Sequence, residues 1–157
     1  MILNRQRAVR VAQRPLELFL ARVRRELGIS EADVTICLVS DEEIARMNRE
    51  FRKKEGPTDV LSFPAIERGK RAAVARKHSR TVKRSGRGAP TGYFLGDIAI
   101  SPSTARRNSK ELGRTLPSEL QILVLHGVLH LLGYDHETDR GEMDRIEARL
   151  RRRLGLS

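Results

Sequence analysis

The chain has little cysteine, few aromatic residues and no long apolar run. Of its 157 residues, one is cysteine (Cys37), none is tryptophan and 4% are aromatic. A single cysteine excludes an internal disulfide framework and favours a reducing, cytoplasmic compartment. No apolar run approaches the roughly 20 residues that a membrane-spanning helix needs, so no membrane partner is expected. With so few aromatic rings, base stacking is not expected to dominate any contact with nucleic acid.

Positive charge is abundant but unevenly distributed. The chain carries 31 Lys and Arg against 20 Asp and Glu, a formal net charge of +11, which suits nucleic acid or an anionic surface. Nine of the basic residues and one acidic residue fall within residues 67–92. This stretch has no hydrophobic periodicity, which predicts a loop insert. It is either a tether to RNA or the ribosome through phosphate contacts or a solvated loop without a dedicated role.

Hydrophobic periodicity predicts a single domain in which strands and helices intermix, of the α+β or α/β class. The expected helices are residues 15–27, a helix opened by the capping box Ser40 to Glu43, a helix opened by Ser101-Pro102, residues 117–132 and residues 140–153. The expected strands are residues 34–39, 59–63 and 95–100. The helix at 117–132 is apolar nearly all round, which predicts a central, buried position. Ile44, Met47 and Phe51 are expected to form the apolar stripe of the helix that follows Ser40.

Three of the four histidines fall within eleven residues, in the pattern H-x3-H-x2-G-x2-H. His126 and His130 are four residues apart on a predicted helix, so they share a face and can bind one ion. Gly133 permits a left-handed turn, after which His136 can supply a third nitrogen. Three neutral imidazoles leave a fourth position for water, as in catalytic zinc sites. The alternative is a hydrogen-bonded core cluster without metal.

The residue after the first histidine is Gly127, where metalloproteases place their general-base glutamate. A peptidase mechanism therefore lacks its usual base. A metal still lowers the pKa of its bound water without that glutamate, and a substrate with its own nucleophile, such as an RNA 2′-hydroxyl, needs no strong protein base. Asp135, Glu137 and Asp139 are candidates for orienting ligands or moving protons; the alternative is that they are exposed turn carboxylates.

Three motifs, in order along the chain, resemble the YbeY family of bacterial endoribonucleases and rRNA maturation factors. They are Asn48-x3-Arg52 leading to PTDVLSFP at 57–64, LGDIAIS at 95–101, and HGVLHLLGYDH at 126–136. The resemblance covers nearly the whole chain except 67–92. It implies a mixed-sheet, zincin-like α+β fold with the metal site on the central helix and the following turn. It also implies one zinc ion held by the three histidines, although imidazole equally suits other divalent transition metals.

The resemblance implies cleavage of single-stranded RNA in 16S ribosomal RNA maturation and ribosome quality control. The implied partners are ribosomal RNA and the small ribosomal subunit, with ribosomal proteins and an assembly GTPase. The family's essential arginine corresponds to Arg52, whose guanidinium can clamp a phosphate and stabilise the charge that builds on phosphorus. Thr58, Asp59, Ser62 and Asp97 are candidates for shaping a substrate cleft, although Asp59 and Asp97 have alternative roles in bracing the backbone.

We therefore expect one metal-dependent endoribonuclease domain over residues 1–157, with a basic insert at 67–92. Two other functions remain as alternatives: a metallohydrolase acting on another substrate, peptides included, and a non-catalytic ribosome-assembly factor whose zinc braces the fold. Gly127 argues against the peptidase version. An open fourth ligand position argues against a purely structural zinc.

Overall fold

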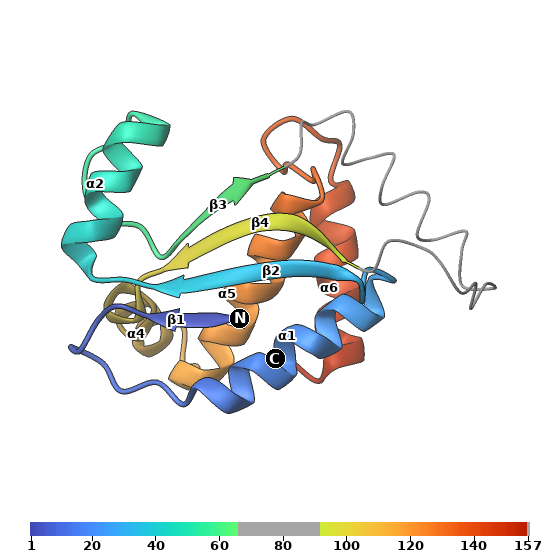
Figure 1. Cartoon of the computed structure of the whole chain (residues 1–157), viewed down its shortest axis with the longest axis horizontal. Helices are drawn as coiled ribbons and strands as arrows, with labels where there is room; N and C mark the ends of the chain where they lie inside the picture. Colours follow the sequence, from blue (N-terminus) through green and yellow to red (C-terminus); the bar gives the residue numbers. More distant parts are fainter. Residues whose placement is uncertain (66–91, 157) are drawn as a thin grey trace.

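A four-stranded mixed sheet forms one layer of the molecule (Figure 1). The computed structural model describes residues 1–65 and 92–156, so the predicted insert at 67–92 lies, apart from Gly92, outside the described residues. The strands are β1 (Ile2–Asn4), β2 (Ala32–Leu38), β4 (Tyr93–Ile100) and β3 (Val60–Pro64), in that spatial order. β1, β2 and β4 are parallel, and β3 runs antiparallel to β4 at the end of the sheet. The mixed sheet of the expected α+β fold is confirmed.

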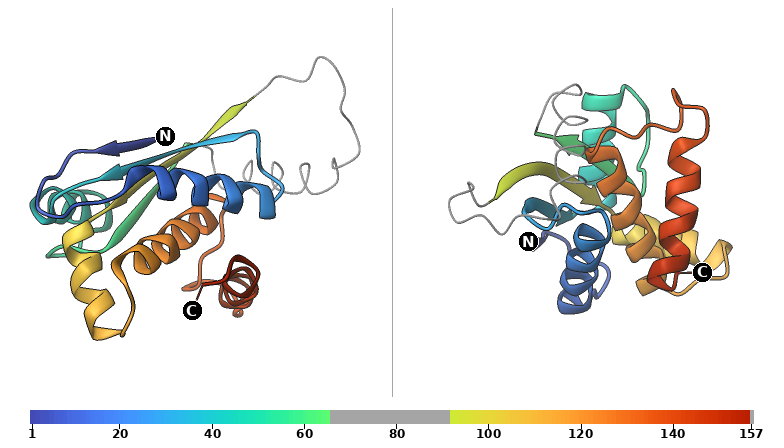
Figure 2. Two further views of the ribbon diagram at one scale, coloured as in Figure 1. Left: turned by 90° about the horizontal axis from the view of Figure 1, so that it is seen from below. Right: turned by 90° about the vertical axis from the view of Figure 1, so that its right-hand side faces the viewer.

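The described residues form five helices, of which four cover the same face of the sheet (Figure 2, left). These four are α1 (Gln13–Glu26), α4 (Pro102–Glu111), α5 (Leu116–Leu131) and α6 (Glu142–Leu154). The fifth, α2 (Asp41–Arg52), lies on the other face beside β3. Within residues 1–65 and 92–156, every helix is too short or too polar to cross a membrane.

α2 and α4 begin where the sequence places their caps. Ser40 Oγ accepts a hydrogen bond from the Glu43 backbone N–H at 3.1 Å, as the capping box predicts. Ser101 Oγ accepts one from the backbone N–H of Thr104 at 3.3 Å, ahead of a proline in the first turn. Such caps satisfy the otherwise unpaired N–H groups of the first turn. All five described helices start within two residues of the expected positions, including α1 and α6, whose first turns have no side-chain cap.

Asp41 joins the start of α2 to the start of α4. Its carboxylate accepts hydrogen bonds from the Ser101 hydroxyl at 2.6 Å, the Thr104 hydroxyl at 2.7 Å and the Arg107 guanidinium at 2.9 Å. Burial alone would raise the pKa of Asp41, but these three donors hold that pKa below its usual value. The first turn of α2 is thereby fixed at the carboxyl ends of β2 and β4.

α5 lies at the centre of the core, as its apolar sequence predicts, and two glycines let it approach the sheet closely. A Cβ at Gly127 would lie 2.8 Å from the side chain of Ile98 on β4. A Cβ at Gly96 would lie 2.5 Å from the Phe63 carbonyl oxygen and 2.7 Å from Leu131. Real Cβ atoms do not come so close to other atoms. The close packing brings the last turns of α5 against β3, where a Ser62 hydroxyl donates to the Gly127 carbonyl at 3.2 Å.

α2 packs on the opposite face through a smaller apolar cluster. Its buried members are Val39, Ile44, Leu61 and Ala99, with Cys37, Met47 and Phe63 packed against them. The predicted apolar stripe of α2 is therefore confirmed at Ile44 and Met47. It is wrong at Phe51, whose ring contacts Phe63 but is 65% exposed, because among the described strands it is the edge strand β3 that lies beside the last turn of α2.

Candidate metal centre

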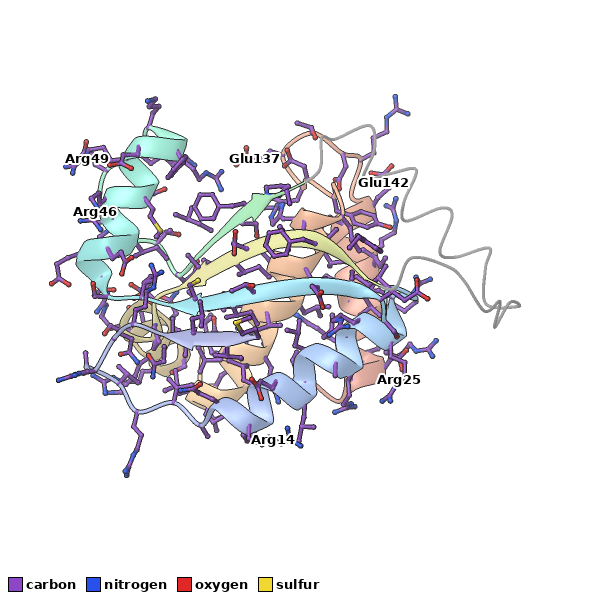
Figure 3. All side chains as sticks on the ribbon, viewed as in Figure 1. Arg14, Arg25, Arg46, Arg49, Glu137 and Glu142 are labelled. Atoms are coloured by element: carbon purple, nitrogen blue, oxygen red, sulfur yellow. The ribbon has the colours of Figure 1, made fainter. Side chains whose placement is uncertain are left out.

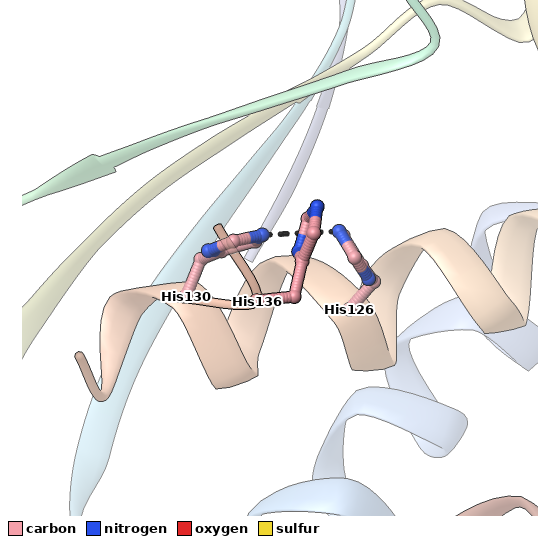
Figure 4. A group of neighbouring side chains, drawn as sticks. All are labelled: His126, His130 and His136. Atoms are coloured by element: carbon pink, nitrogen blue, oxygen red, sulfur yellow. Dashed lines mark hydrogen bonds between the residues drawn. The ribbon is translucent and has the colours of Figure 1, made fainter. Parts of the chain in front are cut away.

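The three predicted metal ligands lie together at the end of α5 (Figure 4). His126 and His130 project from the last two turns of α5. Gly133, at φ +99°, then lets the chain turn back so that His136 faces them. The Nε2 atoms of His126 and His130 are 3.0 Å apart, and one ring nitrogen from each of the three residues lies within 4.8 Å of the others.

The geometry and chemistry of this cluster fit a divalent metal ion. Tetrahedral zinc with nitrogen ligands at 2.0–2.1 Å needs nitrogens about 3.3 Å apart. The 3.0 Å between the His126 and His130 nitrogens lies close to that value, and the His136 nitrogen lies within 4.8 Å of both. Burial, together with the neighbouring rings of His126 and His136, lowers the pKa of His130. A lowered pKa keeps this imidazole neutral at physiological pH, the form in which histidine binds metal.

A carboxylate on α6 orients the first of the three histidines. Glu147 Oε1 lies 3.1 Å from His126 Nδ1. When Nδ1–H donates to this carboxylate, the Nε2 lone pair is left facing the cluster, an arrangement common among zinc-binding histidines. Burial alone would raise the pKa of Glu147, but the hydrogen bond from His126 and the charge of Arg151 bring that pKa below its usual value. The carboxylate is therefore ionised at neutral pH.

Sequence reasoning missed Glu147, although the sequence contains a clue to it. Met143 and Leu150 are buried on α6, and Glu147 lies four residues after the first and three before the second. It therefore shares their apolar face. A carboxylate in a buried stripe needs a partner, and a histidine on a neighbouring helix is a suitable one.

Replacing this carboxylate with an amide is expected to weaken metal binding. Glu147→Gln should raise the dissociation constant for Zn²⁺ by about 10- to 100-fold, the usual cost of losing such a supporting group, measured by competition with a chromogenic chelator. Asp144→Asn is the matched control, because Asp144 is an exposed carboxylate on the same helix. Equal weakening in both variants would show a general charge effect and contradict an orienting role for Glu147.

A pocket of about 410 Å³ opens beside the histidines. Its walls come from the end of α2 and the loop after it, from β3, and from the turn after α5. Of the residues predicted from the sequence, it is lined by Arg52, Thr58, Asp59 and Ser62 together with His126, His130 and His136. Residues from two of the three sequence motifs, the one at 48–64 and the one at 126–136, therefore share one pocket.

Among the four residues predicted to shape the substrate cleft, Asp97 is the one that the structure does not bring to this pocket. It pairs in register with Phe63, and its neighbour Ile98 faces Gly127 on α5. Because side chains alternate along a strand, Asp97 faces the α2 side of the sheet. On that side lies the half-buried Cys37 thiol. Its pKa is raised mainly by its own burial and secondly by the negative charge of Asp97. A thiol with a raised pKa stays protonated and unreactive at neutral pH.

Arg52 lies at the end of α2, across the pocket from the turn that carries His136. Its guanidinium is 3.9 Å from Glu137 Oε1, and both side chains are about half exposed. Lys53 ends the helix in a left-handed conformation at φ 56°. Asn48, a buried residue whose role the sequence did not reveal, donates from Nδ2 to the Gly56 carbonyl at 3.0 Å. This hydrogen bond holds the loop that follows Arg52 against the pocket.

The other polar residues of the pocket wall are themselves held in place. Asp59 accepts hydrogen bonds from the Thr58 hydroxyl at 3.4 Å and from Asn108 Nδ2 on α4 at 3.3 Å. Asp59 therefore both lines the pocket and braces the start of β3. The Ser62 hydroxyl, which donates to Gly127, keeps its lone pairs as acceptors.

The three turn carboxylates differ in their positions. Asp135 and Glu137 line the pocket, and Asp135 Oδ1 accepts a hydrogen bond from the Glu137 backbone N–H at 3.0 Å. Asp139 instead accepts from the backbone N–H groups of Gly141 and Met143 at 2.8 and 2.9 Å. Asp139 therefore stabilises the start of α6 and is neither a residue of this pocket nor the exposed turn carboxylate considered as the alternative.

Gly127 explains why the site has no glutamate after its first histidine. A side chain at 127 would point at Ile98 in the sheet and away from the histidine cluster. A glutamate there would be buried against apolar atoms without a partner. The peptidase alternative therefore lacks both the base and the space for one.

Comparisons with known proteins agree with this architecture and these motifs. The family profile described as Endoribonuclease YbeY matches residues 2–155. The chain is 40% identical over 156 residues to "Endoribonuclease YbeY" of Koribacter versatilis, covering 99% of this chain and 86% of that protein. It is 41% identical over 152 residues to the protein of the same name from Solibacter usitatus, covering 96% and 86%. A solution structure from Thermotoga maritima superposes with a TM-score of 0.59 at 27% identity, covering 98% and 89%. The chain therefore belongs to the endoribonuclease YbeY family.

Proposed function

We propose that residues 1–157 form one metal-dependent domain that cleaves single-stranded regions of 16S ribosomal RNA at the small ribosomal subunit, in the cytoplasm. Membership of the family makes the chain an endoribonuclease, a hydrolase of RNA phosphodiester bonds. In this proposal His126, His130 and His136 hold one zinc ion, and the basic segment 67–92 adds contacts to RNA phosphates. The observation that carries the proposal is the convergence of three imidazoles and Arg52 on one pocket.

The chemistry divides between the three histidines and the opposite wall of the pocket. A bound zinc ion supplies a Lewis acid and a water molecule of lowered pKa. Glu147 keeps the His126 ring oriented towards the cluster. Arg52, on the opposite wall, binds the non-bridging oxygens of the scissile phosphate and stabilises the charge that develops on them.

The contact between Arg52 and Glu137 is weak enough for a phosphate to replace it. At 3.9 Å and with both groups exposed, such an ion pair contributes little to stability. A phosphate offers two oxygens to the planar guanidinium, and bidentate charge-assisted bonds are shorter and stronger. Arg52 is therefore available to substrate while it remains directed across the pocket.

The size of the pocket supports a single-stranded substrate. Its volume of about 410 Å³ falls in the range of small-molecule sites, which suits a splayed nucleotide. In duplex RNA the bases are stacked and paired, and only backbone groups and shallow groove edges are available. Unpaired loops and ends present the bent backbone that this pocket requires.

The test compares metal-stripped and zinc-loaded protein on one 16S rRNA fragment, supplied single-stranded or annealed to its complement. We expect cleavage of the single strand that disappears on stripping, returns with zinc and is strongly reduced for the duplex. The His126→Ala/His130→Ala protein, purified in parallel, controls for contaminating nuclease. Equal cleavage of both substrates, or full activity after stripping, would overturn the proposal.

A further inference from the structure

Two phenylalanines lie together beside the pocket, on the other side of β3. Phe51 is 65% exposed, more than any other large apolar side chain of the described residues except Met1. Its ring contacts Phe63 edge to face, with ring centroids 5.1 Å apart and an interplanar angle of 75°. Isolated exposed apolar residues are ordinary, but this ring is braced by a second ring, which fixes its position.

The phenylalanine pair is separated from the histidine cluster by one strand. β3 is the last strand of the sheet, and its successive side chains point to opposite faces. Ser62 pairs with Ile98 and faces α5, whereas Phe63 pairs with Asp97 and faces α2. A polymer that leaves the pocket across β3 therefore meets the phenylalanine pair next.

The crossing point carries positive charge. Arg52 and Lys54 line the pocket at the end of α2, directly after Phe51 in the chain. Residues 46–55 contain five basic and two acidic residues. Figure 3 shows Arg46 and Arg49 on the side of α2 that is turned away from β3, so the charge nearest the crossing comes from Arg52 to Lys54. Cations beside an exposed ring are the combination that binds single-stranded nucleic acid.

We propose that Phe51, supported by Phe63, is a stacking platform for one base of the single-stranded RNA, beside the nucleotide whose phosphate Arg52 holds. This inference rests on the proposed function and assigns it a substrate-binding residue. The ring gives affinity without sequence preference, because every base has a π face. The low aromatic content of the chain does not oppose this, since one placed ring is sufficient for one base.

The first test measures binding to a 10-nucleotide RNA made uncleavable by 2′-O-methyl groups. Phe51→Ala should weaken binding by about 5- to 30-fold, in the range of one lost stacking interaction. Phe51→Leu, which keeps apolar bulk without a π face, should lose nearly as much, and Phe51→Tyr should bind almost as wild type. Leu112→Ala is the matched control, because Leu112 is 58% exposed at the end of α4 and should leave affinity unchanged.

A second test uses the absence of tryptophan from the chain. In Phe51→Trp the new indole is the only tryptophan, so its fluorescence reports directly on stacking. We expect quenching by the 10-nucleotide RNA, and none by inorganic phosphate or by an abasic strand of the same length. If the RNA and the abasic strand quench the fluorescence equally, the indole reports phosphate contact alone, and the proposal is overturned.

The outcomes separate this inference from the proposed function. If wild-type protein cleaves RNA but Phe51→Ala binds it with unchanged affinity, the stacking platform is wrong and the endoribonuclease proposal stands. An exposed ring that serves a protein partner would give this same result. If wild-type protein neither binds nor cleaves single-stranded RNA while holding zinc, both proposals fail. Zinc content should be equal in all Phe51 variants, because Phe51 does not touch the histidines.

Discussion

Replacing His126 and His130 together with alanine is expected to reduce bound metal from one ion per chain to none detectable, and RNA cleavage to background. The two residues supply two of three ligands and hold their nitrogens 3.0 Å apart on one helix face. His136 would be left as a single imidazole on an exposed turn, and one imidazole does not hold zinc in competition with water. Metal analysis of the purified protein by mass spectrometry gives the first measurement.

The same variant can be tested by thermal stability. A ligand that binds only the folded state stabilises it by about 4 kcal/mol at a thousandfold excess over Kd, so zinc should raise the Tm of the wild type but not of the double variant. His78→Ala removes the fourth histidine and should keep both the metal and the Tm increase. Stoichiometric zinc in the purified double variant would refute the ligand assignment.

The histidine cluster could be predicted from the sequence because its geometry is almost entirely local. Helical spacing alone puts His126 and His130 on one face, and Gly133 marks the turn that returns His136. Glu147 is different, since it reaches His126 only through the packing of α6 against α5. Spacing along the chain carries no information about that contact, although the position of Glu147 among buried neighbours shows that it needs a partner.

The sequence does not predict to which face of the sheet the side chains of the strands point. LGDIAIS identifies β4, but both faces of this central strand carry apolar residues, so alternation does not tell which face the helices cover. A register irregularity between Asp33 and Val34 also shifts the pairing of β2 with β4 by one residue. The structure consequently puts Asp97 beside Cys37, whereas Ser62 on β3 reaches the pocket as expected. Phe51 shows the same limit, because helical periodicity predicts a face but not how far the sheet extends beneath it.

The fold also explains how a strongly basic chain can have a site of mixed charge. Most of the excess charge lies in residues 67–92, and the other 131 residues carry 22 basic and 19 acidic side chains. Around the pocket, Arg52 and Lys54 face Asp59, Asp135 and Glu137. Specific recognition of one phosphate therefore depends on the few cations directed into the pocket, and among these Arg52 lies opposite the turn that carries His136.

Arg52→Ala is accordingly expected to lower kcat for RNA cleavage by about 10²- to 10³-fold, the usual cost of removing one donor that stabilises developing charge. Metal content and Tm should stay close to wild type, because the side chain is about half exposed and its ion pair with Glu137, within the described part of the chain, is long. Arg52→Lys keeps the charge but loses the planar guanidinium that binds two oxygens. Its kcat should therefore fall between those of the wild type and Arg52→Ala. Single-turnover kinetics on a short single-stranded RNA separate kcat from binding.

Arg49→Ala provides the matched control for Arg52→Ala. Arg49 is an exposed arginine on the same helix, three residues earlier and outside the pocket lining, so its removal changes the net charge of α2 equally. If both variants lose the same small amount of affinity and none of kcat, Arg52 acts only through general attraction of RNA. A fall in kcat confined to Arg52→Ala, with zinc still bound, requires a guanidinium that binds the phosphate more tightly in the transition state than in the ground state. The direction of Arg52 across the pocket towards the turn that carries His136 is the structural basis for expecting that result.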